Sequence, residues 1–393
     1  MANDNKHGAF TGLTKNTFLL TFTSFFADVS TEMLYPILPI FLTQTLGVSA
    51  SIVGIVEGVA EATQNIVQGF SGWLADKLQK RKPVALLGYT IAALSKPFIG
   101  TAHVWQVVLG TRFLDRLGTG TRSAPRDALI AASTDEKHRG KAFGLEGIGD
   151  NFGAFIGPIV AIVLLFVLHV RIRNIFYFAF IPGFLAVLMI LFVKEKNIVI
   201  QAKSKIDLSL KKFPAMYWKY IFFTALFGIG NSSNSFLILR TKNVGAPLLE
   251  TILFYTFFNL VAALISYPAG SLSDTFGRKN ILLGAFGVFI ITYLGFALST
   301  NIFLLGFLFI LYGLFQGIFR AVGKAFATDF VPQHLRASGI GWYSTTVGLS
   351  SLIASIVGGE LWTSINPSAT FFYGVLFAVI GGIGMFLFIP QKK

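Results

Sequence analysis

The chain of 393 residues contains 54% hydrophobic but only 13% charged residues, whereas soluble domains carry about 25% charged residues. This composition excludes a soluble globular protein and predicts an integral membrane protein. Cysteine is absent, which excludes disulfides, thiolate metal sites and cysteine nucleophiles. The net charge of +14 does not require a nucleic-acid partner, because membrane proteins concentrate Lys and Arg in their cytoplasmic loops.

Twelve apolar stretches are long enough to cross a bilayer as helices, which takes about 20 residues each. They cover residues 17–42, 51–75, 84–102, 104–125, 140–168, 174–193, 216–239, 248–273, 280–299, 302–325, 338–361 and 369–389. If both termini are cytoplasmic, most of the 32 Lys and Arg residues fall inside, and only Arg171, Arg173, Arg240 and Lys242 fall outside. The sequence therefore predicts an all-α integral membrane protein with an even number of spans.

The longest interior connection is rich in Lys and divides the chain into two halves. We place a polar tail at residues 1–16, a six-helix bundle at 17–193 and a cytoplasmic linker at 194–215. A second six-helix bundle follows at 216–389, with a cytoplasmic tail at 390–393.

The second span carries a polar stripe of Glu57, Glu61, Gln64 and Gln68, whose spacing of three and four places them on one helical face. A charged residue at the centre of a bilayer costs about 2.5–3.5 kcal/mol. We therefore expect the stripe to face the protein interior or a water-filled space.

Further carboxylates lie at membrane depth in the first half, namely Asp28 and Glu32 in the first span and Glu146 and Asp150 in the fifth. Ionisable residues inside membrane spans commonly mark ion pathways and proton relays. The proton-coupling candidates are Asp28, Glu32, Glu57, Glu61 and Asp150. The alternative for each is structural pairing with a basic residue, of which the first half offers Lys96, Arg112, Arg116, Arg122 and Arg126.

Substrate-binding candidates are polar residues that share a helical face within a span. In the seventh span they follow two glycines, where we expect a broken helix that exposes hydrogen-bonding groups. The alternative is plain interhelical hydrogen bonding or ion pairing. The candidates are Gln64, Arg112, Arg116, Asn231, Asn234, Gln316 and Arg320.

The chain repeats itself. Residues 72–76, Gly-Trp-Leu-Ala-Asp, match residues 270–274, Gly-Ser-Leu-Ser-Asp, and a basic pair follows both at the same distance. Several matches in one order predict two halves of the same topology, related by an axis along the membrane normal.

These motifs resemble the major facilitator superfamily. Residues 270–279 are similar to its signature between helices 2 and 3, from which the first copy departs by carrying Gln79 in place of a glycine. Arg112 resembles the helix-4 arginine of the family, and residues 149–158 resemble the helix-5 motif of proton-coupled exporters, with Ala161 at the downstream small position. The resemblance implies alternating access, with gating residues Gly72, Asp76, Arg81, Gly270, Asp274, Arg278, Gly153, Gly157 and Pro158.

We therefore expect a proton-coupled secondary transporter of the drug/proton antiporter branch, in the cytoplasmic (inner) membrane, that exports a small amphipathic molecule. The alternatives are proton-coupled uptake of an organic anion or metabolite, and divalent-metal export through oxygen ligands near Asp28. The sequence shows no catalytic or metal-ligating pattern, so we expect no enzyme and no cofactor, with the proton gradient as the driving force. The expected partners are a small-molecule substrate and the lipid bilayer, without nucleic acid, and we expect a monomer.

Overall fold

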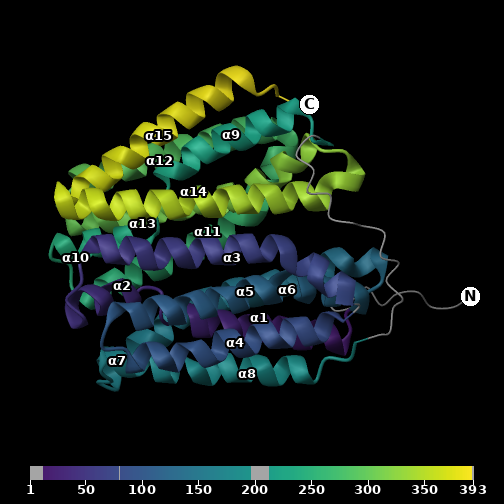
Figure 1. Cartoon of the computed structure of the whole chain (residues 1–393), viewed down its shortest axis with the longest axis horizontal. Helices are drawn as coiled ribbons and strands as arrows, with labels where there is room; N and C mark the ends of the chain where they lie inside the picture. Colours follow the sequence, from purple (N-terminus) through teal and green to yellow (C-terminus); the bar gives the residue numbers. More distant parts are fainter. Residues whose placement is uncertain (1–11, 79, 196–211, 392–393) are drawn as a thin grey trace, which may run out of the picture.

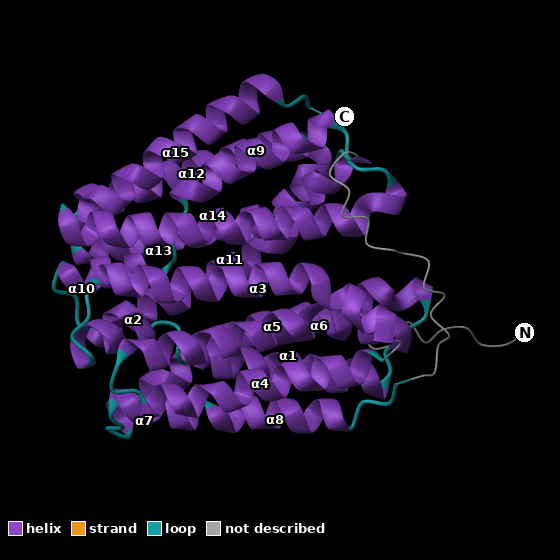
Figure 2. Cartoon of the chain, in the orientation of Figure 1, coloured by secondary structure: helices purple, strands orange, loops and turns teal. Residues whose placement is uncertain are grey.

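The computed structural model describes residues 12–78, 80–195 and 212–391, except for the side chains of Trp73, Asp76 and His334. All regular structure in this part of the chain is helical (Figure 2). Nine helical segments of the described residues are long and apolar enough to cross a membrane. Three further long segments do not meet this combination of length and hydropathy, namely residues 15–45, 50–78 and 105–133. They contain most of the buried ionic side chains described below.

The helices gather into two bundles that lie side by side (Figure 1). The first bundle comprises α1 (Lys15–Glu32), α2 (Leu38–Ile40), α3 (Ala50–Leu78), α4 (Arg81–Thr101), α5 (Trp105–Ser133), α6 (Arg139–Ile162), α7 (Ile172–Phe178) and α8 (Phe180–Leu191). The second comprises α9 (Ala215–Gly230), α10 (Ser235–Asn243), α11 (Leu248–Phe276), α12 (Arg278–Leu298), α13 (Ile302–Asp329), α14 (Arg336–Ser364) and α15 (Pro367–Phe388). Short π-helical turns at Phe41–Thr45 and Val163–Val167 extend the first and fifth spans.

Three predicted spans are interrupted helices. The first span stops being α-helical after Glu32, because Pro36 lacks an N–H and disfavours helical geometry in the residue before it. The sixth is broken at Ala179, near Pro182, which cannot bond to the carbonyl four residues before it. The seventh is broken between Gly230 and Ser235, as the glycines and asparagines there predict.

The two bundles meet along α3 and α14, which lie next to each other over their length (Figure 1). Small residues permit this contact: a Cβ atom added at Gly54 would overlap the carbonyl oxygen of Ser355, and one at Gly359 would lie 2.7 Å from that of Ala50. Helices in lipid associate largely through such close packing of small residues. We call this contact, together with the contact of α1 and α6 with α11, the seam.

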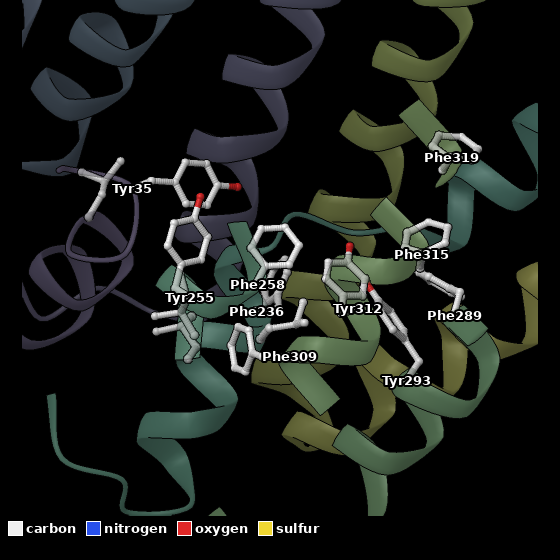
Figure 3. Packing of buried hydrophobic residues seen from close by; sticks show 14 of the residues in the cluster. Tyr35, Phe236, Tyr255, Phe258, Phe289, Tyr293, Phe309, Tyr312, Phe315 and Phe319 are labelled. Atoms are coloured by element: carbon white, nitrogen blue, oxygen red, sulfur yellow. The ribbon is translucent and has the colours of Figure 1, made fainter. Parts of the chain in front are cut away.

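The cores of the two bundles differ in chemistry. Among the described residues, the buried charged side chains of the first bundle are Glu57, Lys96, Arg112, Asp115, Arg116, Arg122 and Glu146, whereas the second bundle buries only Arg240. The second core is filled by aromatic rings, including Phe289, Tyr293, Tyr312, Phe315 and Phe319 (Figure 3). The charge asymmetry seen in the sequence is therefore a property of the packed interior.

Candidate functional site

A buried ion network joins α3, α4 and α5 inside the first bundle. The Arg112 guanidinium donates from Nε and Nη2 to Glu57 at 2.9–3.1 Å and from Nη1 to Asp115 at 3.0 Å. Lys96 Nζ lies 3.6 Å from the second oxygen of Asp115. All four side chains are at most 2% exposed. The predicted proton carrier Glu57 and the predicted substrate ligand Arg112 thus bind each other within the bundle, and their roles in transport stay predictions.

A second group of charges, which we call the α1–α5–α6 cluster, consists of Asp28, Arg122, Arg126, Glu146 and Asp150. Arg122 Nη2 lies 3.6 Å from Asp28 Oδ1. Arg126 Nη1 lies 2.8 Å from Glu146 Oε1 and 3.7 Å from Asp150 Oδ1. The side chains of Asp28 and Asp150 remain 22% and 45% exposed. The cluster therefore combines ion pairing with access from outside the packed core.

The glycine ladder of α6 brings this cluster together. A Cβ atom on Gly149, Gly153 or Gly157 would lie 2.5–2.8 Å from a backbone oxygen of α1. These distances are too short for any side chain, so the backbones of α1 and α6 touch, as the ladder predicts. The added Cβ of Gly153 would also lie 3.1 Å from Cβ of Asp28. Pro158 lies inside the same helix.

Two other predicted proton-coupling residues, Glu32 of α1 and Glu61 of α3, reach the seam, and we call them the seam carboxylates. Glu32 Oε2 accepts hydrogen bonds from the Tyr255 hydroxyl at 2.8 Å and from Asn259 Nδ2 at 3.1 Å. Glu61 accepts a hydrogen bond from the Ser351 hydroxyl. Each seam carboxylate is therefore held by neutral donors of the second bundle.

The predicted substrate ligands fall into three groups. Gln64 accepts a hydrogen bond from Arg116 Nη1 at 2.9 Å, within the first bundle. The Tyr312 hydroxyl bonds to Asn234 at 2.9 Å and to Asn231 at 3.2 Å, where α9 gives way to α10. The remaining two lie on α13: Gln316 has a buried Oε1 without a hydrogen-bond partner among the described residues, and Arg320 is exposed.

The first copy of the repeated loop motif packs against neighbouring helices. A Cβ atom at Gly72 would lie 3.2 Å from Cβ of Ala124 in α5. The Arg81 backbone N–H donates to the Glu195 carboxylate at 2.7 Å, so Glu195 covers the first turn of α4. Asp76 lies in α3, and its side chain is outside the described part of the structure. Its predicted gating role stays a prediction.

In the second copy, Arg278 connects three helices. It begins α12, pairs with Asp274 of α11 at 3.2 Å, and bonds to the carboxylate of Asp329 in α13. A Cβ atom at Gly270 would meet nothing within 4 Å. The two copies therefore share a fold position but differ in their packing.

Sequence reasoning missed Ser351 and Glu195. Ser351 is a neutral residue in an apolar span, and its importance arises only because α14 lies against α3. Glu195 is the second residue of the predicted linker, where a charged residue carries no special signal, yet it caps α4. Both contacts join residues far apart in the chain, so local spacing could not indicate them.

The described residues contain no group of three or more His, Cys, Asp or Glu side chains arranged to hold a metal ion.

Comparisons with known proteins give one consistent picture. A family model described as Major Facilitator Superfamily matches residues 20–239 and 220–393. An uncharacterised MFS-type transporter of Methanocaldococcus jannaschii is 37% identical over 383 residues, covering 96% of this chain and 95% of the relative. The quinolone resistance protein NorA of Staphylococcus aureus is 29% identical over 177 residues, 45% of this chain and 44% of NorA.

Among solved structures, that of a peptide transporter superimposes with a TM-score of 0.79 at 16% identity, covering 96% of this chain and 95% of the other. At that identity the likeness shows the fold alone. It confirms the predicted fold class of an all-α membrane protein built from two bundles.

Proposed function

The chain belongs to the major facilitator superfamily, a family of transporters and not of enzymes, and we propose that it exports a small amphipathic molecule by proton antiport. The protein is a multi-pass membrane transporter, and it works by alternating access between its two bundles. The proposal places it in the cytoplasmic membrane with both termini in the cytoplasm, because that orientation puts most Lys and Arg inside.

The observation that carries proton coupling is the α1–α5–α6 cluster. Charged groups at membrane depth are costly, so a carboxylate that is kept there without a tight ion pair points to a functional role. Asp28 and Asp150 are each close to an Arg, but at 3.6 and 3.7 Å from it rather than in direct hydrogen bonds. A proton bound by either carboxylate would weaken its attraction to that Arg, and this links proton binding to helix position.

Two observations support export over uptake. The glycine ladder of α6 that resembles the exporter motif is in backbone contact with α1, beside Asp28. NorA, which is named for quinolone resistance, is similar to part of this chain. Placement in the drug/proton antiporter branch rests on these two observations.

Uptake of an organic anion or metabolite is the second candidate. The exposed guanidinium of Arg320 favours it, since Arg320 is available to a ligand. Arg112 offers less support, because Glu57 and Asp115 already occupy its donors.

The test uses purified full-length protein in proteoliposomes that contain a pH-sensitive dye. A pH gradient is imposed, and amphipathic compounds and organic anions are added separately. Antiport predicts that compound moves against the proton flux, and that Asp28→Asn abolishes the coupled pH change while Asp135→Asn, in an exposed loop, does not. Movement of compound and protons in the same direction would contradict antiport and support proton-coupled uptake. Full coupled transport by Asp28→Asn would remove the cluster from the mechanism.

A further inference from the structure

Arg122 of α5 is a buried guanidinium whose donors are largely unused. The residue is 5% exposed, and its Nε and Nη1 atoms meet no hydrogen-bond acceptor among the described residues. Its Nη2 lies 3.6 Å from Asp28 Oδ1, whereas a direct hydrogen bond between such ions spans about 2.7–2.9 Å. A buried charge with unused donors is destabilising, so Arg122 requires an acceptor that the described residues do not supply.

Close packing of α4 against α5 holds the Arg122 side chain in place. A Cβ atom at Gly88 of α4 would lie 2.8 Å from the backbone nitrogen of Arg122 and 2.9 Å from its Cβ. The guanidinium carbon lies 4.4 Å from the centroid of the Tyr89 ring, and the hydroxyl of that ring is likewise buried without a hydrogen-bond partner among the described residues. Two adjacent side chains thus present unused donors, and we call the place where they meet the donor site.

The other carboxylates of α1 and α6 near the donor site are bound elsewhere. Arg126 Nη1 lies 2.8 Å from Glu146 and 3.7 Å from Asp150, both on α6. Glu32, one turn after Asp28 on α1, acts on Asp28 electrostatically but accepts its hydrogen bonds from the second bundle. Among the described residues, Asp28 is therefore the one carboxylate that lies within 4 Å of a nitrogen of the donor site.

The buried ion network on the other side of the donor site carries more positive than negative charge. Asp115 lies 3.0–3.8 Å from nitrogens of three cations, Lys96, Arg112 and Arg116. Glu57, the second carboxylate of this network, pairs with Arg112. Of these cations, Lys96 also acts electrostatically on the guanidinium of the donor site. This excess of positive charge favours a negative ion at the donor site.

Asp28 balances the charge of Arg122 only while its carboxylate is ionised. A proton on Asp28 removes one negative charge from the donor site, and one monovalent anion restores it. We propose that the donor site binds a small monovalent anion such as chloride when Asp28 takes up a proton. The inference rests on the proposed function, in which Asp28 is a proton carrier. The Asp28 side chain is 22% exposed, so the site is accessible from outside the packed core.

The anion and the Asp28 carboxylate alternate as the counter-ion of Arg122. The ionised carboxylate repels an anion at this short distance, whereas the protonated carboxyl does not. Arg122 Nε, Arg122 Nη1 and the Tyr89 hydroxyl then donate to the anion. Because linkage is reciprocal, a bound anion also favours proton uptake by Asp28. The attraction between α1 and α5 is thereby released without leaving an unbalanced charge at membrane depth.

The test measures equilibrium binding of radiolabelled chloride to the purified full-length protein in neutral detergent, at a mildly acidic and a mildly alkaline pH. Gluconate, a large organic anion, keeps the ionic strength constant. The wild type should bind chloride saturably and about tenfold or more tightly at the acidic pH, which corresponds to about 1.4 kcal/mol. Arg122→Gln should lose this binding, whereas Arg139→Gln, whose side chain is exposed at the start of α6, should keep it.

Asp28→Asn tests the same site through a gain of binding, which misfolding cannot imitate. The variant lacks the competing negative charge, so it should bind chloride at the alkaline pH as tightly as the wild type does at the acidic pH. Chloride added to a weakly buffered solution should also cause the wild type to take up protons. Asp28→Asn should bind chloride without this proton uptake, because its side chain cannot accept the proton.

The absence of saturable chloride binding to the wild type at both pH values would overturn the proposal, and would indicate that water alone satisfies the donors of Arg122. Unchanged binding in Arg122→Gln, or no gain of binding in Asp28→Asn, would overturn it equally. The proposed function fails separately, if the proteoliposome experiment shows no proton-linked transport while chloride binding still depends on Arg122 and Asp28.

Discussion

Replacing Gly153 by Ala tests whether the contact of α1 and α6 is as close as the structure shows. The new Cβ would lie 2.5 Å from the carbonyl oxygen of Phe25, whereas a carbon and a carbonyl oxygen in contact lie about 3.3–3.6 Å apart. The two helices must therefore separate by about 1 Å. A gap of about 0.5–1 Å loses a quarter to a half of each van der Waals contact, and membrane helices depend on those contacts.

Gly147→Ala on the same helix is the matched control, because a Cβ there meets nothing within 4 Å. Both variants gain about 1 kcal/mol of helix propensity. Only Gly153→Ala suffers the overpacking, which typically costs about 1–3 kcal/mol. The free energy of unfolding of Gly147→Ala should therefore exceed that of Gly153→Ala by the cost of the clash, about 1–3 kcal/mol.

The assay is thermal unfolding of both purified variants in one detergent, followed by proton-coupled transport in proteoliposomes. We expect Gly153→Ala to melt below Gly147→Ala and to lose coupled transport, because the added methyl also displaces Asp28, whose Cβ would lie 3.1 Å from it. If Gly153→Ala melts at or above Gly147→Ala and transports normally, the close contact and its link to the α1–α5–α6 cluster are both wrong.

Three further predictions concern other parts of the structure. Glu57→Gln removes the negative charge that pairs with Arg112 and should lower the free energy of unfolding by about 3–5 kcal/mol, seen as a lower melting temperature. An unchanged melting temperature would contradict the buried pairing. Glu195→Ala uncaps α4 and should cost about 0.5–2 kcal/mol, with faster hydrogen exchange in its first turn, at Arg81; equal exchange would show that the cap is dispensable. Tyr312→Phe keeps the ring but loses its bonds to the asparagines between α9 and α10, so it should cost about 0.5–1.5 kcal/mol in thermal unfolding, and no loss would argue against those bonds.

Much of the candidate site followed from residue spacing alone. Charges are costly in lipid, so the stripe of Glu57 and Glu61 had to turn inward wherever the helix lay. Glycines spaced by four on α6 had to form a close contact, whichever helix supplied the partner. The glycines and asparagines of the seventh span predicted its break, whereas the breaks near Pro36 and Pro182 interrupt two stretches that were expected to be continuous.

The tertiary structure alone decided how these residues are partnered. Two glutamates one turn apart on α3 look equivalent in the sequence, yet Glu57 meets Arg112 inside the first bundle while Glu61 meets Ser351 across the seam. The physical reason is that spacing along one helix fixes the face on which a side chain lies, but the identity of the neighbour depends on which distant helix packs there. The sequence by itself determined an all-helical membrane transporter with its charges in the first half, and the packing of two bundles decided which of those charges pair within the first bundle and which reach the second.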